Sequence, residues 1–445
     1  MSIHETEELV KTDRELIMHP ASIMKMPSGW VVDKGKGLIL MDTDGKEYMD
    51  FVAGLTCVNL GYGRKELAEA AMAEMGKLGY FPTFSGMSNR ANIECAKKLK
   101  QLVPNGINHF FFASGGSDAV DSAFKFALLY WRRKGRGKYK ILSLQNSYHG
   151  VSLGVVNATN LMSPSLVMGA EPLLPGFIHV PYYYCYRCPF GLEYPSCDTK
   201  CARFLETLIE IEGEETVAAF IGEPVQGSGG EIPPPPTYWP LVRRICTEHN
   251  VLLIDDEVMT GFGRTGKMFA MEHWDVKPDI MAMAKGITGA YFPFSVTGIT
   301  DEIFETIAAD PSAILPIAYT YSGHPVGSAV AIKAMEIYKK EKLVENSARV
   351  GKYLLDGMQQ FMELPHVGHV HGLGLFCGID LVTDKATKAK PKLEVIFEVG
   401  KRAMEKGLLV RAYREIVGLT PPLTCTTEEV DRALDILKPI IADIS

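Results

Sequence analysis

The sequence predicts an α/β protein with a large domain, built on a mainly parallel sheet between helices, and a smaller α+β domain. Short apolar runs alternate with amphipathic stretches of helix length through the middle of the chain, which is typical of a parallel sheet covered by helices on both faces. The start of the chain shows a hairpin pattern instead, and the last third returns to long helices and glycine-rich strands. With 445 residues, 47% of them hydrophobic, the chain can bury one large core or two moderate ones.

The first elements in the chain are a hairpin and two helices. Apolar and polar residues alternate over residues 30–51 around the pair Asp44-Gly45, which is a good β-hairpin signal. Helical periodicity follows at residues 65–78 and 89–102. The opening of the chain is therefore expected to be antiparallel.

The middle of the chain carries the strands of the predicted parallel sheet. Helix-length segments, such as residues 118–133 and 237–249, separate these strands, and Pro233 to Pro236 form a stiff connector. The predicted buried strands are residues 109–113, 140–144, 217–222, 251–255 and 279–284.

The last third predicts a long helix at residues 325–341, a second helix after it, strands within 367–381 and a final helix from about Thr427. These patterns predict three segments. Residues 1–75 and 326–445 form the smaller domain, and residues 76–325 form the large domain, with a cysteine-rich insertion at 181–201.

Charge and hydropathy exclude several classes of protein. The net charge of −7 and the pI of about 5.9 leave no basic stripe for phosphates, so no nucleic-acid partner is expected. The first twenty residues mix acids and bases where a signal peptide needs an apolar core. No apolar run approaches the roughly 18 residues that cross a bilayer. We therefore expect a cytoplasmic protein with no membrane partner.

Three segments carry chemistry, and the first is a phosphate-site pattern. The strand ending at Ala113 runs into Ser114-Gly115-Gly116-Ser117 and then into a helix. Backbone N–H groups and the helix dipole favour a phosphate at such a junction, where the Ser117 hydroxyl adds a donor. The alternative is an ordinary glycine-rich turn capped by Ser or Asp.

The second segment places acids at the end of a buried strand. Asp255, Asp256 and Glu257 follow the run Val251 to Ile254, at the carboxyl end where ligands bind in open α/β sheets. Adjacent acids of this kind also bind metals, and isolated strand-end acids are often simply solvated.

The third segment ends an apolar strand with one lysine. Lys285 follows Ile280 to Ala284, and burial there would lower its pKa and leave the amine nucleophilic enough to form an imine, a Schiff base, with an aldehyde. The alternative is a lysine whose amine reaches the surface. A phosphate cradle, a carboxylate and a buried lysine on strand ends of one sheet are together the requirements of pyridoxal 5'-phosphate (PLP).

These segments resemble the class III aminotransferases, PLP enzymes of fold type I with a seven-stranded type of sheet, over nearly the whole chain. The resemblance implies that Lys285 binds the cofactor and moves the proton, and that Asp256 pairs with the pyridinium nitrogen. It also implies that Val258 packs on one ring face, and that Gly116 and Ser117 hold the phosphate. The family's usual Ser-Gly-Ser is Gly-Gly-Ser here, and Asp118 stands where Glu is common.

Two more motifs extend the resemblance. In residues 145–150, Tyr148 and His149 match the family's aromatic-His-Gly motif, which implies that Tyr148 stacks on the other ring face; the alternative is a plain core aromatic. Thr320, within residues 319–325, matches the threonine that reaches the phosphate of the neighbouring subunit. This match implies a homodimer with shared active sites, or a dimer of dimers.

The substrate side resembles the ω-amino acid and amine:pyruvate branch at residues 52–64 and 409–412. Arg411 matches an arginine that binds the keto acid carboxylate and swings away for uncharged amines; the alternative is a surface or interface arginine. Val151 stands where relatives acting on acetylornithine or 4-aminobutyrate carry arginine. Thr56 replaces a bulky aromatic in the amine pocket, so β-alanine, taurine, a diamine and an aryl amine all remain open.

The predicted function is a ping-pong transamination in which an amine or ω-amino acid donates its amino group to pyruvate or another 2-oxo acid. An aminomutase, a racemase or a decarboxylase would keep the same cofactor residues, and a non-catalytic binding protein on this fold is the alternative from another class.

The nine cysteines fall into two groups. Cys57, Cys95, Cys246, Cys377 and Cys425 stand alone in apolar contexts and are expected to be small core residues. Cys185, Cys188, Cys197 and Cys201 have near zinc-knuckle spacing. Zinc, disulfides and four reduced thiols all remain open for them, and no metal site is included among the predicted site residues.

Overall fold

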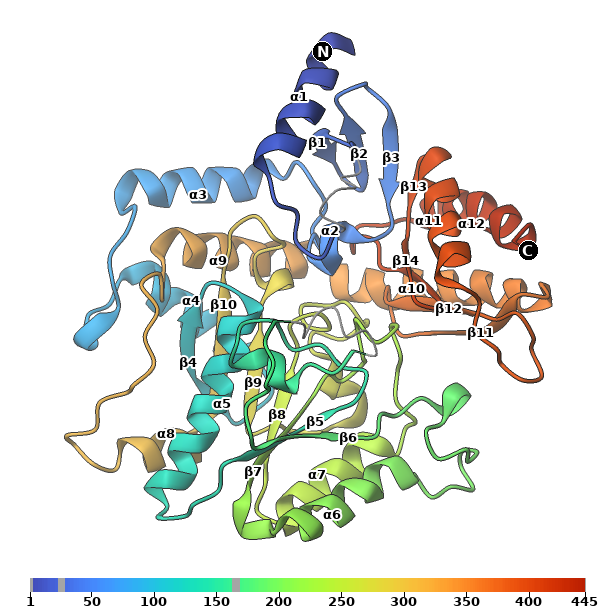
Figure 1. Cartoon of the computed structure of the whole chain (residues 1–445). Coiled ribbons are helices and arrows are strands. Elements are labelled where there is room, and N and C mark those ends of the chain that lie inside the picture. Colours follow the sequence, from blue (N-terminus) through green and yellow to red (C-terminus); the bar gives the residue numbers. More distant parts are fainter. Residues whose placement is uncertain (1–2, 23–28, 162–168, 445) are drawn as a thin grey trace.

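The computed structural model describes residues 3–22, 29–161 and 169–444, and its centre is a seven-stranded sheet (Figure 1). Only β10 runs against its two neighbours, β4 and β9; the pairs among the other strands are parallel, which confirms the predicted fold class. In spatial order the strands are β4 (Ile107–Ala113), β10 (Ser295–Thr300), β9 (Ile280–Met283), β8 (Leu252–Asp256), β7 (Val217–Gly222), β5 (Lys140–Leu144) and β6 (Phe177–Val180).

All five strands predicted for this sheet are confirmed, and β6 and β10 were missed. The sequence of β10, SVTGIT, has no continuous apolar run, yet five of its six residues are buried because the strand lies between β4 and β9. Strand β6 has only four residues, one of which is a histidine. Burial by neighbouring strands, which no local pattern records, makes both segments strands.

Alternate residues of the central strands face two different cores. Ile221 and Ile254 pack with α5 (Gly116–Arg133) on one face. Their sequence neighbours Phe220 and Leu253 pack with α6 (Lys200–Glu212) and α7 (Tyr238–Glu248) on the other. Near β9 and β10 that other face is covered by α4 (Arg90–Lys100) and α9 (Pro325–Lys340), while α8 (Asp301–Ala308) packs on α5.

The start and the end of the chain meet in a small sheet of order β1-β2-β3-β13. Strands β2 and β3 pair antiparallel around Asp44-Gly45, as predicted, and β13 runs parallel to β3. The strands are β1 (Val32–Lys36), β2 (Ile39–Asp42), β3 (Glu47–Asp50) and β13 (Leu408–Leu409). Three helices belong to the same part of the chain: α1 (Ile3–Leu16), α2 (Ala53–Thr56) and α3 (Lys65–Lys77).

A third, antiparallel sheet of order β11-β12-β15-β14 lies among the C-terminal helices (Figure 1). Its strands are β11 (Val367–Gly372), β12 (Cys377–Leu381), β15 (Ile416–Leu419) and β14 (Arg411–Tyr413). The helices are α10 (Leu343–Gln359), α11 (Leu393–Glu405) and α12 (Thr427–Ala442). The predicted long helices are confirmed, whereas the division into domains at residues 75 and 325 stays a prediction.

Short 3₁₀ helices complete the described elements, at Phe84–Gly86, Val155–Ala158, Cys185–Arg187, Glu214–Thr216, Ala270–Trp274, Lys285–Ile287 and Gln360–Glu363. Within the described ranges, none of the helices has both the length and the apolar character to cross a membrane.

Candidate active site

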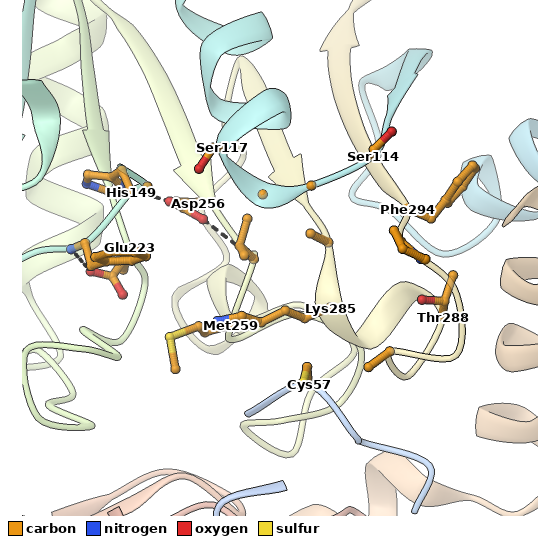
Figure 2. A pocket seen from close by; sticks show the side chains of 18 of the residues that line it. Cys57, Ser114, Ser117, His149, Glu223, Asp256, Met259, Lys285, Thr288 and Phe294 are labelled. Atoms are coloured by element: carbon orange, nitrogen blue, oxygen red, sulfur yellow. Dashed lines mark hydrogen bonds and ion pairs between the residues drawn. The ribbon is translucent and has the colours of Figure 1, made fainter. Parts of the chain in front are cut away.

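The carboxyl ends of β4, β5, β7, β8 and β9 meet at one edge of the sheet, and a cavity of about 340 Å³ lies there (Figure 2). Parallel strands bring their carboxyl ends together, which is why residues far apart in the sequence share this cavity. It is lined by Cys57, Ser114, Gly115, Gly116, Ser117, Tyr148, His149, Gly150, Glu223, Asp256, Val258, Met259, Ala284, Lys285, Thr288, Ala290, Phe292, Pro293 and Phe294.

Lys285 is separated from the end of β9 by Ala284 and begins a 3₁₀ turn, and Figure 2 shows its side chain extending through the cavity beside Met259. Its φ of 45° lies in the left-handed region, which is uncommon for a residue with a side chain. The pKa of Lys285 is lowered to about 8, mainly by burial and also by the charge of Arg411, although Cys57 and Asp256 act to raise it. A substantial fraction of this amine is therefore neutral and nucleophilic near neutral pH.

Asp256, at the end of β8, is fixed by two contacts. One carboxylate oxygen lies 2.6 Å from Nδ1 of His149, and the other accepts the N–H of Val258 at 3.0 Å. Both side chains of the Asp256–His149 pair are almost completely buried. The pair therefore presents an oriented carboxylate at one side of the cavity (Figure 2).

Glu223 follows β7 and was missed by the sequence analysis. Its carboxylate accepts the N–H groups of Tyr148 at 3.0 Å and Gly227 at 2.8 Å, and burial raises its pKa to about 7. The signal that could have found it is its place directly after the predicted strand 217–222, at the same sheet edge as Asp256. Glu223 holds the backbone of Tyr148, whose side chain borders the cavity.

The start of α5 has the features of an anion site. The Asp118 carboxylate accepts the N–H groups of Ser114 and Gly115, at 3.3 and 3.0 Å, and so caps the helix. Gly116 and Ser117 follow and border the cavity. Because the N–H groups in the first turn of a helix have no acceptor within the helix, those of Gly116 and Ser117 are available to an anion. A Cβ on Gly150 would lie 2.3 Å from Oγ of Ser117, so glycine is required there.

The residues present fit PLP. The first turn of α5 offers N–H donors for a phosphate, and Asp256 offers an oriented carboxylate for a protonated ring nitrogen. Val258 and Tyr148 border the space between them, and Lys285 offers an amine with a lowered pKa for the aldehyde. The structure thus brings Gly116, Ser117, Tyr148, His149, Asp256, Val258 and Lys285 together.

Three other predicted site residues, Thr320, Thr56 and Arg411, do not border this cavity. Thr320 is exposed, and its carbonyl oxygen accepts the Tyr80 hydroxyl at 2.7 Å. Thr56 is buried, with its hydroxyl 3.2 Å from that of Thr420, and its neighbour Cys57 borders the cavity instead. This placement does not support the predicted substrate contact of Thr56.

Arg411 begins β14 and lies close enough to affect the pKa values of Lys285 and Tyr148. Its side chain is 25% exposed, and Nη2 donates to Oγ of Ser228 at 3.2 Å. Val151, at the position that suggested the missing arginine clamp, is exposed.

Most of the cysteines lie as expected. Cys95, Cys246, Cys377 and Cys425 are buried, but the prediction of Cys57 as a core residue is wrong, because it borders the cavity. All nine thiols are free, so the clustered four form no disulfide. The clustered four border a second, much smaller cavity, and among the described residues no group of three or more His, Cys, Asp or Glu could hold a metal ion.

Comparisons with known proteins agree with this geometry. The family model for "Aminotransferase class-III" matches residues 22–441. A putrescine–pyruvate aminotransferase from Pseudomonas aeruginosa is 35% identical over 92% of this chain and 89% of that protein. A taurine–pyruvate aminotransferase from Bilophila wadsworthia is 35% identical over 96% and 95%. The crystal structure of an (S)-enantioselective omega-transaminase from Thermomicrobium roseum superposes with a TM-score of 0.95 at 40% identity, over 98% of both chains.

Proposed function

Because the chain belongs to the class III aminotransferase family, we propose that it transfers the amino group of an amine or ω-amino acid to pyruvate or another 2-oxo acid. Transamination with PLP is the activity of the family; the substrates are what we add. Relatives that act on putrescine or taurine with pyruvate support this choice. The observation that carries it is the guanidinium of Arg411, whose charge acts on Lys285, near a cavity whose lining includes the apolar residues Phe292, Pro293 and Phe294.

We assign the cofactor roles as follows. With PLP bound, Gly116 and Ser117 would hold the phosphate through N–H groups, Asp256 would keep the ring nitrogen protonated, and Lys285 would bind the aldehyde carbon. His149 orients Asp256 through their 2.6 Å contact. When bound, PLP supplies an electron-accepting ring that acidifies the hydrogen on the carbon next to the substrate amine.

Lys285 is also the proton carrier in this proposal. Its Nζ accepts the proton from the substrate carbon of the amine and, in the second half of the reaction, returns a proton to the carbon of the 2-oxo acid. A pKa of about 8 suits both tasks, because the amine can take up and release a proton near neutral pH. Arg411 binds the carboxylate of the 2-oxo acid, for which a guanidinium fork has the matching geometry.

We further propose a homodimer. Large exposed apolar side chains gather on two segments that lie side by side, since Tyr80 contacts Thr320 and Tyr321. Ile314 is 86% exposed and Tyr321 is 60% exposed. A second copy of the chain would cover them and receive Thr320 at its phosphate site. The nine free thiols fit a reducing compartment, so we propose a cytoplasmic location.

The test is an absorbance titration of the purified, PLP-loaded protein. The visible cofactor band should bleach on addition of an accepted amine and return on addition of pyruvate. A panel of monoamines, diamines, β-alanine and taurine identifies the donor. Turnover of a single substrate without any 2-oxo acid would indicate an aminomutase, a racemase or a decarboxylase instead, and retention of full turnover by Lys285→Ala would refute the proposal.

A further inference from the structure

The segment that carries Thr320, residues 311–320, lies in the long connection between α8 and α9 (Figure 1). It forms neither a helix nor a strand, and most of its residues are exposed. Two of its side chains pack against the core around α5: Ile317, which is 4% exposed, and Tyr319, which is half-buried. Thr320, the next residue, is exposed again. The segment is therefore fastened to its own subunit at Ile317 and Tyr319 and presents Thr320 at the surface.

The Tyr319 hydroxyl is held by the first two turns of α5. It donates to Oδ2 of Asp121 at 2.9 Å, and both Oγ of Ser122 and the carbonyl oxygen of Asp118 lie 3.4 Å from it. Burial raises the pKa of Tyr319, so the hydroxyl keeps its proton and remains a donor. Its acceptor is itself fixed, because Nζ of Lys125 lies 2.8 Å from Oδ2 of Asp121. The residue before Thr320 is thus attached to a helix.

A second contact acts on Thr320 directly. The Tyr80 hydroxyl donates to the carbonyl oxygen of Thr320 at 2.7 Å, and this contact leaves Thr320 exposed. The hydroxyls of Tyr319 and Tyr80 therefore fix the backbone of Thr320 from two different parts of the chain.

The helix that holds Tyr319 is also the helix whose first turn forms the phosphate site. The Asp118 carboxylate caps this turn by accepting the N–H groups of Ser114 and Gly115, and Asp121 lies one turn further along α5. The phosphate site of a subunit and the residue that it lends to its partner are therefore attached to the same helix.

We propose that Tyr319 is a positioning residue for the phosphate site of the partner subunit, because it fixes Thr320 on α5 of its own subunit. This inference rests on the proposed homodimer. Tyr319 does not border the cavity of its own subunit, so it acts through Thr320. A residue that is fixed before binding loses less conformational entropy on binding. Loss of the Tyr319 hydroxyl therefore weakens the hold on PLP in the partner subunit and not in its own.

The test uses mixed dimers, purified through a different affinity tag on each subunit, in which Lys285→Ala leaves one subunit that can bind PLP through its amine. In the first mixed dimer, Tyr319→Phe lies in the Lys285→Ala subunit. In the second, it lies in the subunit that keeps Lys285. The rate at which the visible cofactor band is lost during dialysis measures PLP release.

The first mixed dimer should release PLP about five-fold faster than a mixed dimer without Tyr319→Phe, which corresponds to about 1 kcal/mol, the usual contribution of one hydrogen bond. The second should release PLP at the unaltered rate, because Thr320 at its cofactor comes from the subunit with an intact Tyr319. A general structural defect of Tyr319→Phe would not depend on which subunit carries it.

Tyr130→Phe is the matched control. Tyr130 also lies on α5, and its hydroxyl donates to a carboxylate, that of Glu302 on α8, at 2.6 Å. Its replacement in the Lys285→Ala subunit should leave PLP release unchanged, whereas Tyr80→Phe there should accelerate it. Equal release rates from the two mixed dimers, or faster release from the second, would overturn the role of Tyr319. Sedimentation of the unaltered protein as a monomer would overturn the proposed homodimer instead.

Discussion

The lowered pKa of Lys285 predicts how fast the protein captures PLP at each pH. Its pKa of about 8 lies below the ordinary value of 10.5, which corresponds to about 300 times more neutral amine at neutral pH. Only the neutral amine attacks an aldehyde. At pH 7 about a tenth of Lys285 is neutral, so capture should be about 300-fold faster than for a fully solvated lysine with the same geometry.

Stopped-flow absorbance after mixing the cofactor-free protein with PLP between pH 6 and 10 measures this rate. The rate constant should rise up to about pH 8 and then level off. Lys285→Ala should capture no PLP, and Arg411→Met should move the plateau to higher pH, because the positive charge of Arg411 helps to lower the pKa of Lys285. A rate constant that still rises tenfold per pH unit at pH 9 to 10 would show that the lysine is not desolvated and would refute the reasoning.

Three further variants test single contacts of the site. Arg411→Met should raise the KM for pyruvate by about 10- to 150-fold, because hydrogen bonds to a charged group contribute about 1.5–3 kcal/mol. The KM for aldehyde acceptors should not change. Equal losses for both acceptors in half-reaction kinetics would contradict the role of Arg411. Asp256→Asn should reduce turnover by at least about 100-fold while PLP is still bound, because the ring nitrogen loses its ionic partner; near-normal steady-state turnover would rule this out. Gly150→Ala should weaken PLP retention, because the new Cβ would lie 2.3 Å from Oγ of Ser117. The φ of 132° at this position would add backbone strain of about 1–3 kcal/mol. Unchanged PLP release during dialysis would argue against a close-packed phosphate loop.

The sequence was informative where local pattern and topology act together. Five strands were predicted from apolar runs, and their parallel order alone brings Ser117, Tyr148, Asp256 and Lys285 to one edge of the sheet. Residues whose role depends on contacts across the fold were not predicted. The place of Glu223 after a predicted strand is a signal, but nothing local indicates that its carboxylate holds the Gly227 backbone or that Glu231 is buried beside an arginine. The contact of Thr56 with the Thr420 hydroxyl was not predicted for the same reason, since Thr420 lies in the C-terminal third.

Three adjacent acids, Asp255, Asp256 and Glu257, lie at the end of β8 and have different environments. Because side chains alternate along a strand, Asp256 borders the cavity, while Asp255 and Glu257 do not. Both oxygens of Asp255 lack a hydrogen-bond partner among the described residues, and burial raises its pKa well above the ordinary value. Burial likewise raises the pKa of Glu257 to about 8.

Burial therefore favours the neutral forms of Asp255 and Glu257, and neither side chain borders the cavity that Asp256 faces. Asp256 differs from Asp255 because the Val258 N–H and His149 supply partners for its carboxylate, and it differs from Glu257, which accepts from Thr260 and the Met271 N–H, because it borders the cavity. An Asp-Asp-Glu run on a solvated loop would be a site for a divalent cation; on a strand buried on both faces it becomes a single oriented carboxylate. Strand parity and the burial of the two neighbouring acids thus leave Asp256 as the carboxylate of this run that borders the cavity.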